Sequence, residues 1–277
     1  MEKTLIKNTV TDRIADTLFI PLFMKYKETK KQNSFFHDPY SSELVKRIDY
    51  DFQKYSKAVQ SSVGVAIRAL YIDEVAKDFI ESNANPVIVH IGCGLDTRYQ
   101  RLGEKITGKT LFYEMDLPEV ISLRKKLIPE SSNNPYLSTS MLETDWMDDL
   151  VRKYPESSFL FISEGVFMYF KREQVKSVLI NISSRFQNSR ILFDVVSGWM
   201  CRNCHRHETV KLTNAVFLFD CDDDKEMESW TDKLRLEVSK KFIDFNDWKN
   251  VGKIKYFLSR NIPVIRNSAR ILLYSVN

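Results

Sequence analysis

The sequence predicts a doubly wound α/β fold, with a seven-stranded, mostly parallel sheet, helices on both faces, an antiparallel last strand and an N-terminal helical lid. Short apolar runs alternate with helical stretches through the middle of the chain, which is typical of a parallel sheet covered on both faces. A long helical segment precedes this alternation. A length of 277 residues, with 43% hydrophobic and 28% charged residues, suits one globular domain with helical additions.

The first third of the chain is predicted to be helical. From Val63 onward, apolar residues recur every three or four positions, the period of an amphipathic helix with one buried stripe. Residues 83–86 end that helix. Before it, residues 35–40 mark a turn, because Pro39 disfavours helix at Asp38.

Strands and helices then alternate. The helix candidates of this region are residues 117–127 and 172–186. The strand candidates are residues 87–91, 110–115, 136–139, 159–163 and 190–196. After residue 196 the alternation stops, and two further strand candidates, 236–245 and 269–276, follow with no clear helix between them. We therefore expect an antiparallel pair that completes a sheet of seven strands.

These elements predict a division into two parts. Residues 1–85 would form an N-terminal helical lid, and residues 86–277 the α/β core. The core would carry an insertion around residues 197–232, a segment rich in Cys, His and acidic groups.

Charge and composition limit the possible partners. The 41 Lys and Arg against 37 Asp and Glu give a formal charge of +4, and the basic residues are scattered, which argues against nucleic acid as a partner. The densest basic run, residues 25–31, is expected to be a solvated helix face. No apolar stretch approaches the roughly 20 residues that span a bilayer, and no secretory signal is visible, so we expect a cytoplasmic protein that does not bind membranes.

Residues 87–98 carry the most informative motif. An apolar strand runs into the turn Gly92-Cys93-Gly94, where glycines allow a ligand to approach the main chain. This predicts a ligand against Gly92 and Gly94 at the carboxyl end of the first core strand. A dinucleotide fingerprint needs a third glycine at position 97, where this chain has Thr97. The motif therefore favours a nucleotide-type ligand other than a dinucleotide.

Acidic residues follow the next strand candidates. Glu114 and Asp116 come just over twenty positions after the glycines, where a carboxylate would bind ribose hydroxyls, and either could serve. Asp145 and Glu164 follow the next two strands. Because ligands bind beyond the carboxyl ends of parallel strands, we expect these groups to face one crevice.

Four motifs resemble the leucine carboxyl methyltransferases and their bacterial relatives that methylate polyketide carboxylates, a family with a Rossmann-like fold. In order and spacing they cover most of the chain. The motifs are Phe36-His37-Asp38-Pro39-Tyr40, Ile91-Gly92-Cys93-Gly94-Leu95-Asp96-Thr97-Arg98, Tyr113-Glu114-Met115-Asp116-Leu117-Pro118 and Ser163-Glu164-Gly165-Val166-Phe167-Met168-Tyr169.

The resemblance implies S-adenosylmethionine as the cofactor and a role for particular residues. Arg68 is similar to the arginine that holds the cofactor carboxylate, with Lys25 assisting, and Gly92 to the glycine under the methionine moiety. Asp116 resembles the ribose-binding acid and Glu164 the acid near the cofactor's amino group. Asp145 and Trp146 resemble the pair around the adenine. The chain departs from the family at Cys93, usually alanine, and at Trp146, usually leucine.

The implied activity is O-methyl transfer to a carboxylate or a hydroxyl. The acceptor would be a small molecule such as a polyketide-like acid or phenol, or a protein C-terminus, and the insertion around residues 197–232 would face it. A carboxylate is already ionised at neutral pH, whereas a phenol needs a general base. No catalytic residue is evident, because His90 lies within a strand and is expected to be packed, and His37 lies in the turn before Asp38.

Two alternatives remain open at this point. A nicotinamide-dependent oxidoreductase would share the acid at the strand end but should carry the third glycine. A non-catalytic S-adenosylmethionine-binding protein would share the whole fold. The cluster Cys201, Cys204, His205 and His207 invites a zinc hypothesis, but four ligands from seven consecutive residues are cramped, so we expect free thiols and no metal. The oligomeric state cannot be read from these patterns.

Overall fold

The seven-stranded sheet is present in the computed structural model of the chain, which describes residues 5–7, 15–103, 106 and 108–277. Its strand order is β5-β4-β3-β6-β7-β9-β8. The strands are β3 (Pro86–Ile91), β4 (Leu111–Asp116), β5 (Tyr136–Ser138), β6 (Ser158–Ser163), β7 (Arg190–Val196), β8 (Leu234–Lys241) and β9 (Ala269–Val276). A separate parallel pair joins β1 (Ile6–Lys7) to β2 (Ile48–Asp49).

The first five core strands run parallel, and β9 is antiparallel to both of its neighbours, β7 and β8. This confirms the predicted mostly parallel sheet with an antiparallel last strand. β8 begins at Leu234, two residues earlier than expected, and ends at Lys241, where a 3-10 helix replaces the rest of the predicted strand.

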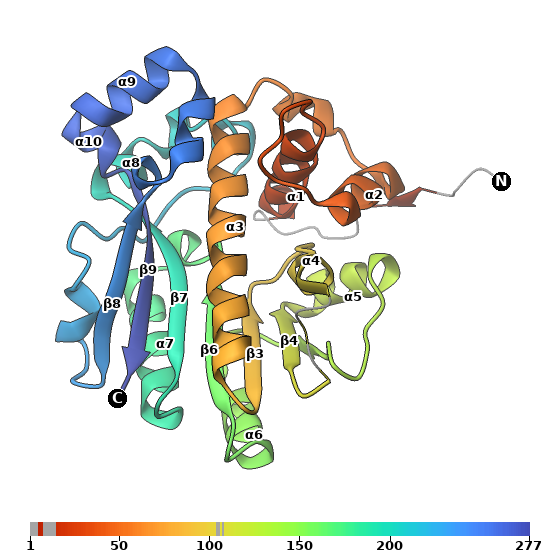
Figure 1. Cartoon of the computed structure of the whole chain (residues 1–277), viewed down its shortest axis with the longest axis vertical. Coiled ribbons are helices and arrows are strands. Elements are labelled where there is room, and N and C mark those ends of the chain that lie inside the picture. The colour runs from red at the N-terminus through yellow and green to blue at the C-terminus, as the bar shows by residue number, and fades with distance from the viewer. Residues whose placement is uncertain (1–4, 8–14, 104–105, 107) are drawn as a thin grey trace.

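Helices cover both faces of the sheet (Figure 1). The long helix α3 runs along one face, and α6 and α7 lie on the other. The helices are α1 (Ala15–Thr29), α2 (Pro39–Arg47), α3 (Val59–Ser82), α4 (Arg98–Leu102), α5 (Pro118–Leu127), α6 (Asp145–Lys153), α7 (Arg172–Arg185), α8 (Gly198–Arg202), α9 (Lys253–Asn261) and α10 (Pro263–Arg266). Short 3-10 helices occupy Phe52–Tyr55, Phe167–Tyr169, Cys204–Arg206, Val210–Leu212, Glu226–Ser229, Phe242–Asp244 and Asn246–Val251.

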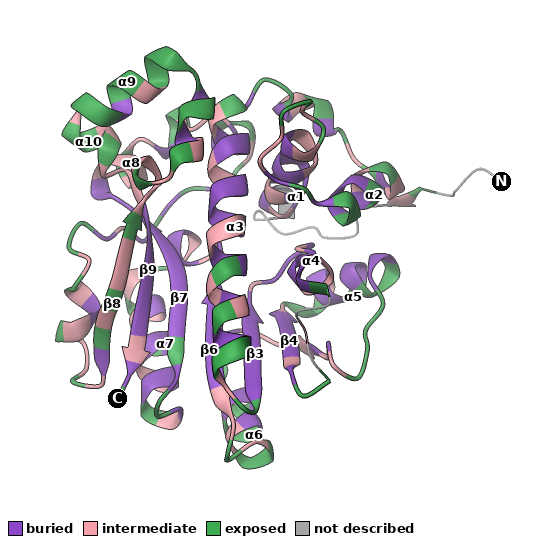
Figure 2. Ribbon diagram, viewed as in Figure 1, coloured by how far each residue is buried: buried purple, intermediate pink, exposed green. Residues whose placement is uncertain are grey.

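Alternate residues of each strand fill two cores, because side chains point to opposite faces of a sheet in turn. Val87, Val89 and Ile91 of β3 pack against α6 and α7, whereas Ile88 packs against the second half of α3. All six residues of β3 are buried (Figure 2). The second half of α3 therefore belongs to the layer on the sheet, although it precedes residue 86.

Asp38 begins α2 as the expected turn requires. Its Oδ1 accepts a hydrogen bond from the N–H of Ser41 at 2.9 Å, and Pro39 occupies the first helical position, where a missing N–H costs nothing. Its Oδ2 accepts from the Thr97 hydroxyl at 2.6 Å and pairs with Arg101 at 3.0 Å. Asp38 thus ties the N-terminal helices to the segment that follows the glycine turn.

The connection between β8 and β9 differs from the prediction. α9 and α10 lie in it, and α9 is mostly exposed (Figure 2). Ile254 and Phe257 of α9 are 77% and 64% exposed, so the helix lacks the buried apolar stripe by which a sequence pattern would identify it.

No helix within the described ranges is long and apolar enough to cross a membrane. All four cysteines are free thiols, as predicted.

Candidate active site

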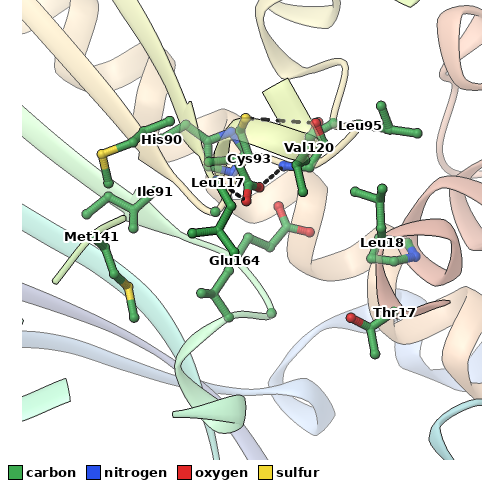
Figure 3. A pocket seen from close by; sticks show the side chains of 18 of the residues that line it. Thr17, Leu18, His90, Ile91, Cys93, Leu95, Leu117, Val120, Met141 and Glu164 are labelled. Atoms are coloured by element: carbon green, nitrogen blue, oxygen red, sulfur yellow. Dashed lines mark hydrogen bonds between the residues drawn. The ribbon is translucent and has the colours of Figure 1, made fainter. Parts of the chain in front are cut away.

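A cavity of about 290 Å³ opens at the carboxyl ends of β3, β4, β5 and β6, with α1 across it. Figure 3 shows Thr17 and Leu18 of α1 opposite Ile91 and Met141. This first cavity brings together five of the predicted residues: Lys25, Gly92, Gly94, Asp116 and Glu164. Sequence reasoning missed Thr139 and Ser140, which line the cavity directly after β5 and carry no distinctive motif.

Gly92 and Gly94 form a tight turn with φ of +67° and +52°, a region that other residues adopt only with strain. A Cβ at Gly92 would lie 2.5 Å from Val166 Cγ2, and one at Gly94 would lie 2.7 Å from Leu18 Cδ1. The glycines therefore allow a close approach of the protein's own side chains as well as of a ligand. The positive φ angles and the close contacts with Val166 and Leu18 are both possible because glycine has no Cβ.

Asp116, rather than Glu114, faces the cavity. The N–H groups of Gly94 and Leu117 donate to the two Asp116 oxygens at 2.8 Å each, which fixes the carboxylate and leaves further lone pairs available. Burial raises the pKa of Asp116, and these N–H groups oppose that rise. Glu114 is fully buried and pairs with Arg124 at 2.8 Å, with His90 3.1 Å away, so it is not among the lining residues.

Glu164 lies at the centre of a buried ionic network. Its Oε1 accepts from Arg68 Nε at 3.1 Å, its Oε2 accepts a short hydrogen bond from Arg98, and Lys25 Nζ is 3.9 Å away. Burial by itself would raise the pKa of Glu164, but Lys25, Arg98 and Arg68 together hold it well below its ordinary value. Glu164 is therefore an anion on the wall of the cavity.

Lys25 is buried, with 2% exposure, so the expectation that residues 25–31 form a solvated helix face is wrong for this residue. Its Nζ pairs with Asp96 Oδ2 at 2.6 Å. Burial opposes ionisation of Asp96, but Lys25, Arg98 and Arg101 hold the pKa of Asp96 well below its ordinary range. The helix containing Lys25 packs onto the core at this point, and the pairing with Asp96 offsets the cost of burying the charge.

The other three predicted residues lie elsewhere. Asp145 and Trp146 begin α6 and are not among the residues that line the first cavity; Trp146 packs into the core, and Asp145 is exposed. Arg68, on α3, lines a second cavity, where its guanidinium pairs with Asp194 at 2.6 Å as well as with Glu164. Their cofactor roles remain predictions.

The second cavity has a volume of about 340 Å³ and adjoins the first. Four residues line both cavities: Thr17, Pro21, Gly165 and Tyr169. Aromatic side chains from distant segments contribute to its wall, namely Trp199, Phe217, Phe242 and Trp248. The two adjoining cavities provide space for two ligands that meet between α1 and the segment after β6.

The polar groups of the second cavity are largely engaged. Asp194 accepts from Arg68 and from the Gly165 N–H at 2.6 Å. Glu208 pairs with Lys255 and accepts from the Ser61 N–H at 3.0 Å. Burial raises the pKa of Tyr169 far above its ordinary value, so its hydroxyl stays protonated at neutral pH. Arg206 and Arg266 are exposed and make no ion pair with any residue that the structure describes.

The Cys201, Cys204, His205 and His207 segment does not assemble a metal site. Cys201 Sγ donates to the Phe217 carbonyl at 3.2 Å, Cys204 is buried, and His205 is exposed. Within the described ranges, no group of three or more His, Cys, Asp or Glu side chains could hold a metal ion. His207 alone of the four lines the second cavity.

A glycine turn, a strand-end carboxylate and a buried acid around one cavity, on a seven-stranded sheet with an antiparallel β9, define a class I S-adenosylmethionine-dependent methyltransferase. The family model described as "Leucine carboxyl methyltransferase" matches residues 19–183, more than half of the chain. The chain belongs to the leucine carboxyl methyltransferase family, and it is an enzyme that uses S-adenosylmethionine. This excludes the oxidoreductase and the non-catalytic alternatives.

Known proteins similar to this chain agree with that assignment. The tetracenomycin polyketide synthesis O-methyltransferase TcmP of Streptomyces glaucescens is 27% identical over 265 residues, 95% of this chain and 96% of the relative. The S-adenosyl-L-methionine-dependent methyltransferase dpfgK of Gibberella zeae is 28% identical over 278 residues, 93% and 92% of the two chains. The fold is similar to a putative methyltransferase from Thermobifida fusca, with a TM-score of 0.56, 10% identity and coverage of 92% and 94%.

Proposed function

We propose that this enzyme methylates a carboxylate oxygen of a small, largely apolar acid that occupies the second cavity. The observation that carries the proposal is the pairing of the two cavities. The first is lined by five of the predicted cofactor residues, and the second adjoins it through Thr17, Pro21, Gly165 and Tyr169. A carboxylate placed at that junction would face the reactive end of a cofactor in the first cavity.

We propose that Lys25, Gly92, Gly94, Asp116 and Glu164 hold S-adenosylmethionine. When bound, this cofactor supplies an electrophilic methyl group on a positively charged sulfonium. The described charged side chains that line the first cavity are four carboxylates and one Lys. The carboxylates belong to Asp96, Asp116, Glu119 and Glu164. That excess of negative charge suits a cofactor whose sulfonium and ammonium outnumber its carboxylate.

The state of the polar groups in the second cavity favours a carboxylate over a phenol. A phenol has a reference pKa near 10 and needs a base to remove its proton, whereas a carboxylate is ionised at neutral pH. Asp194 and Glu208 already pair with Arg68 and Lys255, and the Tyr169 hydroxyl keeps its proton. Arg206 and Arg266 line this cavity without an ion-pair partner among the described residues, and their charge also favours an anionic acceptor.

We further propose that α1 and α2 act as the predicted N-terminal lid, whereas the second half of α3 belongs to the core, and that the insertion around residues 197–232 selects the acceptor. Thr17 and Pro21 of α1 line both cavities, and Trp199, His207 and Phe217 of the insertion line the second. The name of TcmP, an O-methyltransferase of polyketide synthesis, supports a polyketide-like acceptor. Water exclusion by these two segments would favour methyl transfer, in which the enzyme chiefly orients the reactants.

The proposal is tested by supplying S-adenosylmethionine together with fused-ring acids and the phenols of the same rings, such as 2-naphthoic acid and 2-naphthol. We expect S-adenosylhomocysteine and a methyl ester from the acids, and no methyl ether from the phenols. Ether formation without ester formation would show a hydroxyl acceptor and would overturn the assignment of a carboxylate.

Asp116→Ala is expected to weaken S-adenosylmethionine binding more than tenfold. The carboxylate is fixed by two N–H groups and faces the cavity, so its charge-assisted hydrogen bonds to the ribose hydroxyls would be lost. Isothermal titration calorimetry measures the effect. Asp148→Ala, which removes an exposed acid of α6, is the matched control and should bind as the wild type does. Equal affinities of the two variants would remove Asp116 from the site.

A further inference from the structure

His207 lines the second cavity and is not one of the predicted cofactor residues. It follows the 3-10 helix Cys204–Arg206 and lines the second cavity, where its ring meets that of Phe217 edge to face, with centroids 6.1 Å apart. Phe217 lines the same cavity. The contact fixes the plane of the imidazole, so its two nitrogens have different surroundings.

One ring nitrogen of His207 is turned towards the main chain. The N–H groups of Thr209 and Val210 both donate to Nδ1, each at a distance of 3.5 Å, and the Thr209 hydroxyl oxygen lies 3.2 Å from Nδ1. A backbone N–H can only donate, so Nδ1 must present a lone pair. In a neutral imidazole the proton then lies on Nε2.

The surroundings keep this imidazole neutral. Burial is the main cause that lowers the pKa of His207 to about 4, and the positive charge of Arg68 acts in the same direction. Glu208 opposes them, but its own carboxylate already pairs with Lys255 and the Ser61 N–H. His207 therefore presents an uncharged N–H donor at neutral pH.

The second nitrogen, Nε2, makes no hydrogen bond with any residue in the described ranges, and it is not among the buried polar atoms that lack a partner. It lies on the side of the ring away from Nδ1 and its main-chain donors. We propose that His207 is the positioning residue for the methyl acceptor, its Nε2–H donating a hydrogen bond to an acceptor oxygen in the second cavity. This inference rests on the proposed function.

The tautomer decides what His207 can do. It cannot take a proton from the acceptor, because Nε2 already carries one and Nδ1 is covered by the main chain. A neutral donor orients a carboxylate while withdrawing less of its charge than a guanidinium would, since hydrogen bonds to charged donors are about twice as strong. The acceptor oxygens thus remain nucleophilic, as methylation without a general base requires.

Two substitutions separate this role from a purely structural one. In His207→Asn the amide can still accept from the Thr209 and Val210 N–H groups but cannot reach the position of Nε2. In His207→Gln the longer side chain can place an N–H donor there. We expect His207→Asn to weaken binding of 2-naphthoate at least tenfold and His207→Gln to stay within about threefold of the wild type. Both variants should bind S-adenosylhomocysteine normally.

Binding is measured by calorimetry on the full chain saturated with S-adenosylhomocysteine. Stronger 2-naphthoate binding by His207→Asn than by His207→Gln would show that His207 only caps the main chain, and would overturn the proposal. Equal affinities of the wild type and His207→Asn would overturn it too. Failure of 2-naphthoate to bind the wild type counts against the proposed acceptor class instead. Binding needs no methyl transfer, so the two failures are distinguishable.

A second measurement needs no acceptor. The ¹⁵N chemical shifts of the ring nitrogens distinguish a protonated nitrogen from an unprotonated one, and the His207→Asn spectrum identifies the signals of His207. We expect protonated Nε2 and unprotonated Nδ1 from pH 5.5 to pH 8. A proton on Nδ1, or a titration near the ordinary histidine pKa of about 6.5, would overturn the proposal.

Discussion

Arg98→Met is expected to lower the free energy of unfolding by about 3–5 kcal/mol at pH 7, the usual cost of leaving a buried charge without its partner. The Arg98 side chain has no exposed surface, and it donates to Asp73 at 2.7 Å and to Glu164, with Asp96 3.5 Å away. Methionine keeps the apolar stem and removes only the guanidinium. The variant therefore reports the electrostatic contribution.

The net charge of the buried ionic network around Glu164 explains why loss of a cation should cost more stability than loss of an anion. Its described members hold a formal charge of −1, from the cations Lys25, Arg68, Arg98 and Arg101 and the anions Asp38, Asp73, Asp96, Glu164 and Asp194. Removal of Arg98 doubles the excess of negative charge, whereas Glu164→Gln neutralises it. We therefore expect Glu164→Gln to cost less stability than Arg98→Met.

Urea unfolding as a function of pH checks the origin of the effect. The pKa of Glu164 lies well below its ordinary 4.5, so the stability it contributes is complete above about pH 4.5 and is lost as the pH falls through the lowered value. The deficit of Arg98→Met should accordingly be full above pH 4.5 and shrink below it. Arg152→Ala, which breaks an exposed pair with Asp149, should change stability by less than about 1 kcal/mol. Equal losses in both variants would contradict the argument.

The fold could be predicted from the sequence where strands are buried and short. The predicted bounds of β7 and β9 are those that the structure shows, because a largely buried strand appears as a mostly apolar run. α9 and α10 could not be predicted, since α9 exposes apolar side chains and buries only Ser259. Periodicity signals a helix only when one face is consistently buried.

The candidate site was predictable where the backbone imposes it. The turn at Gly92 requires glycine, and Asp116 and Glu164 follow strands, so topology alone brings them to one edge of the sheet. Asp145 also follows a strand, but six residues separate it from Ser138 at the end of β5, and α6 turns it towards solvent. A spacing rule holds only for residues directly at the end of a strand.

The second cavity could not be predicted. Its wall joins α1, α3, the segment after β6, the end of β7, the insertion and the connection between β8 and β9, parts of the chain that no local pattern connects. Arg68 illustrates the difficulty. The resemblance implies that it contacts the cofactor, which stays a prediction, and the structure places it on the wall of the second cavity, between Glu164 and Asp194.

Gly92→Ala is expected to weaken S-adenosylmethionine binding about 100-fold, equivalent to about 2.8 kcal/mol. The left-handed φ of +67° costs a residue with a Cβ roughly 1–2 kcal/mol, and the new methyl group would lie 2.5 Å from Val166 Cγ2 and 3.0 Å from Cγ1. Overpacking of this kind costs about 1–3 kcal/mol. Gly92 and Val166 both line the first cavity, so displacement of either residue changes its shape.

The double variant Gly92→Ala/Val166→Ala separates the two causes. Val166→Ala removes the two nearest atoms that the methyl group would meet, Cγ1 and Cγ2, and leaves Val166 Cβ at 3.3 Å, while the positive φ required at position 92 stays the same. We expect the double variant to recover about tenfold in affinity over Gly92→Ala, measured by calorimetry, while Val166→Ala alone stays close to the wild type. Non-additivity of that size is the signature of two groups in direct contact. If the double variant does not recover affinity, the loss comes from backbone strain at position 92. Gly92→Asn should then bind S-adenosylmethionine better than Gly92→Ala despite its larger side chain, because asparagine tolerates positive φ.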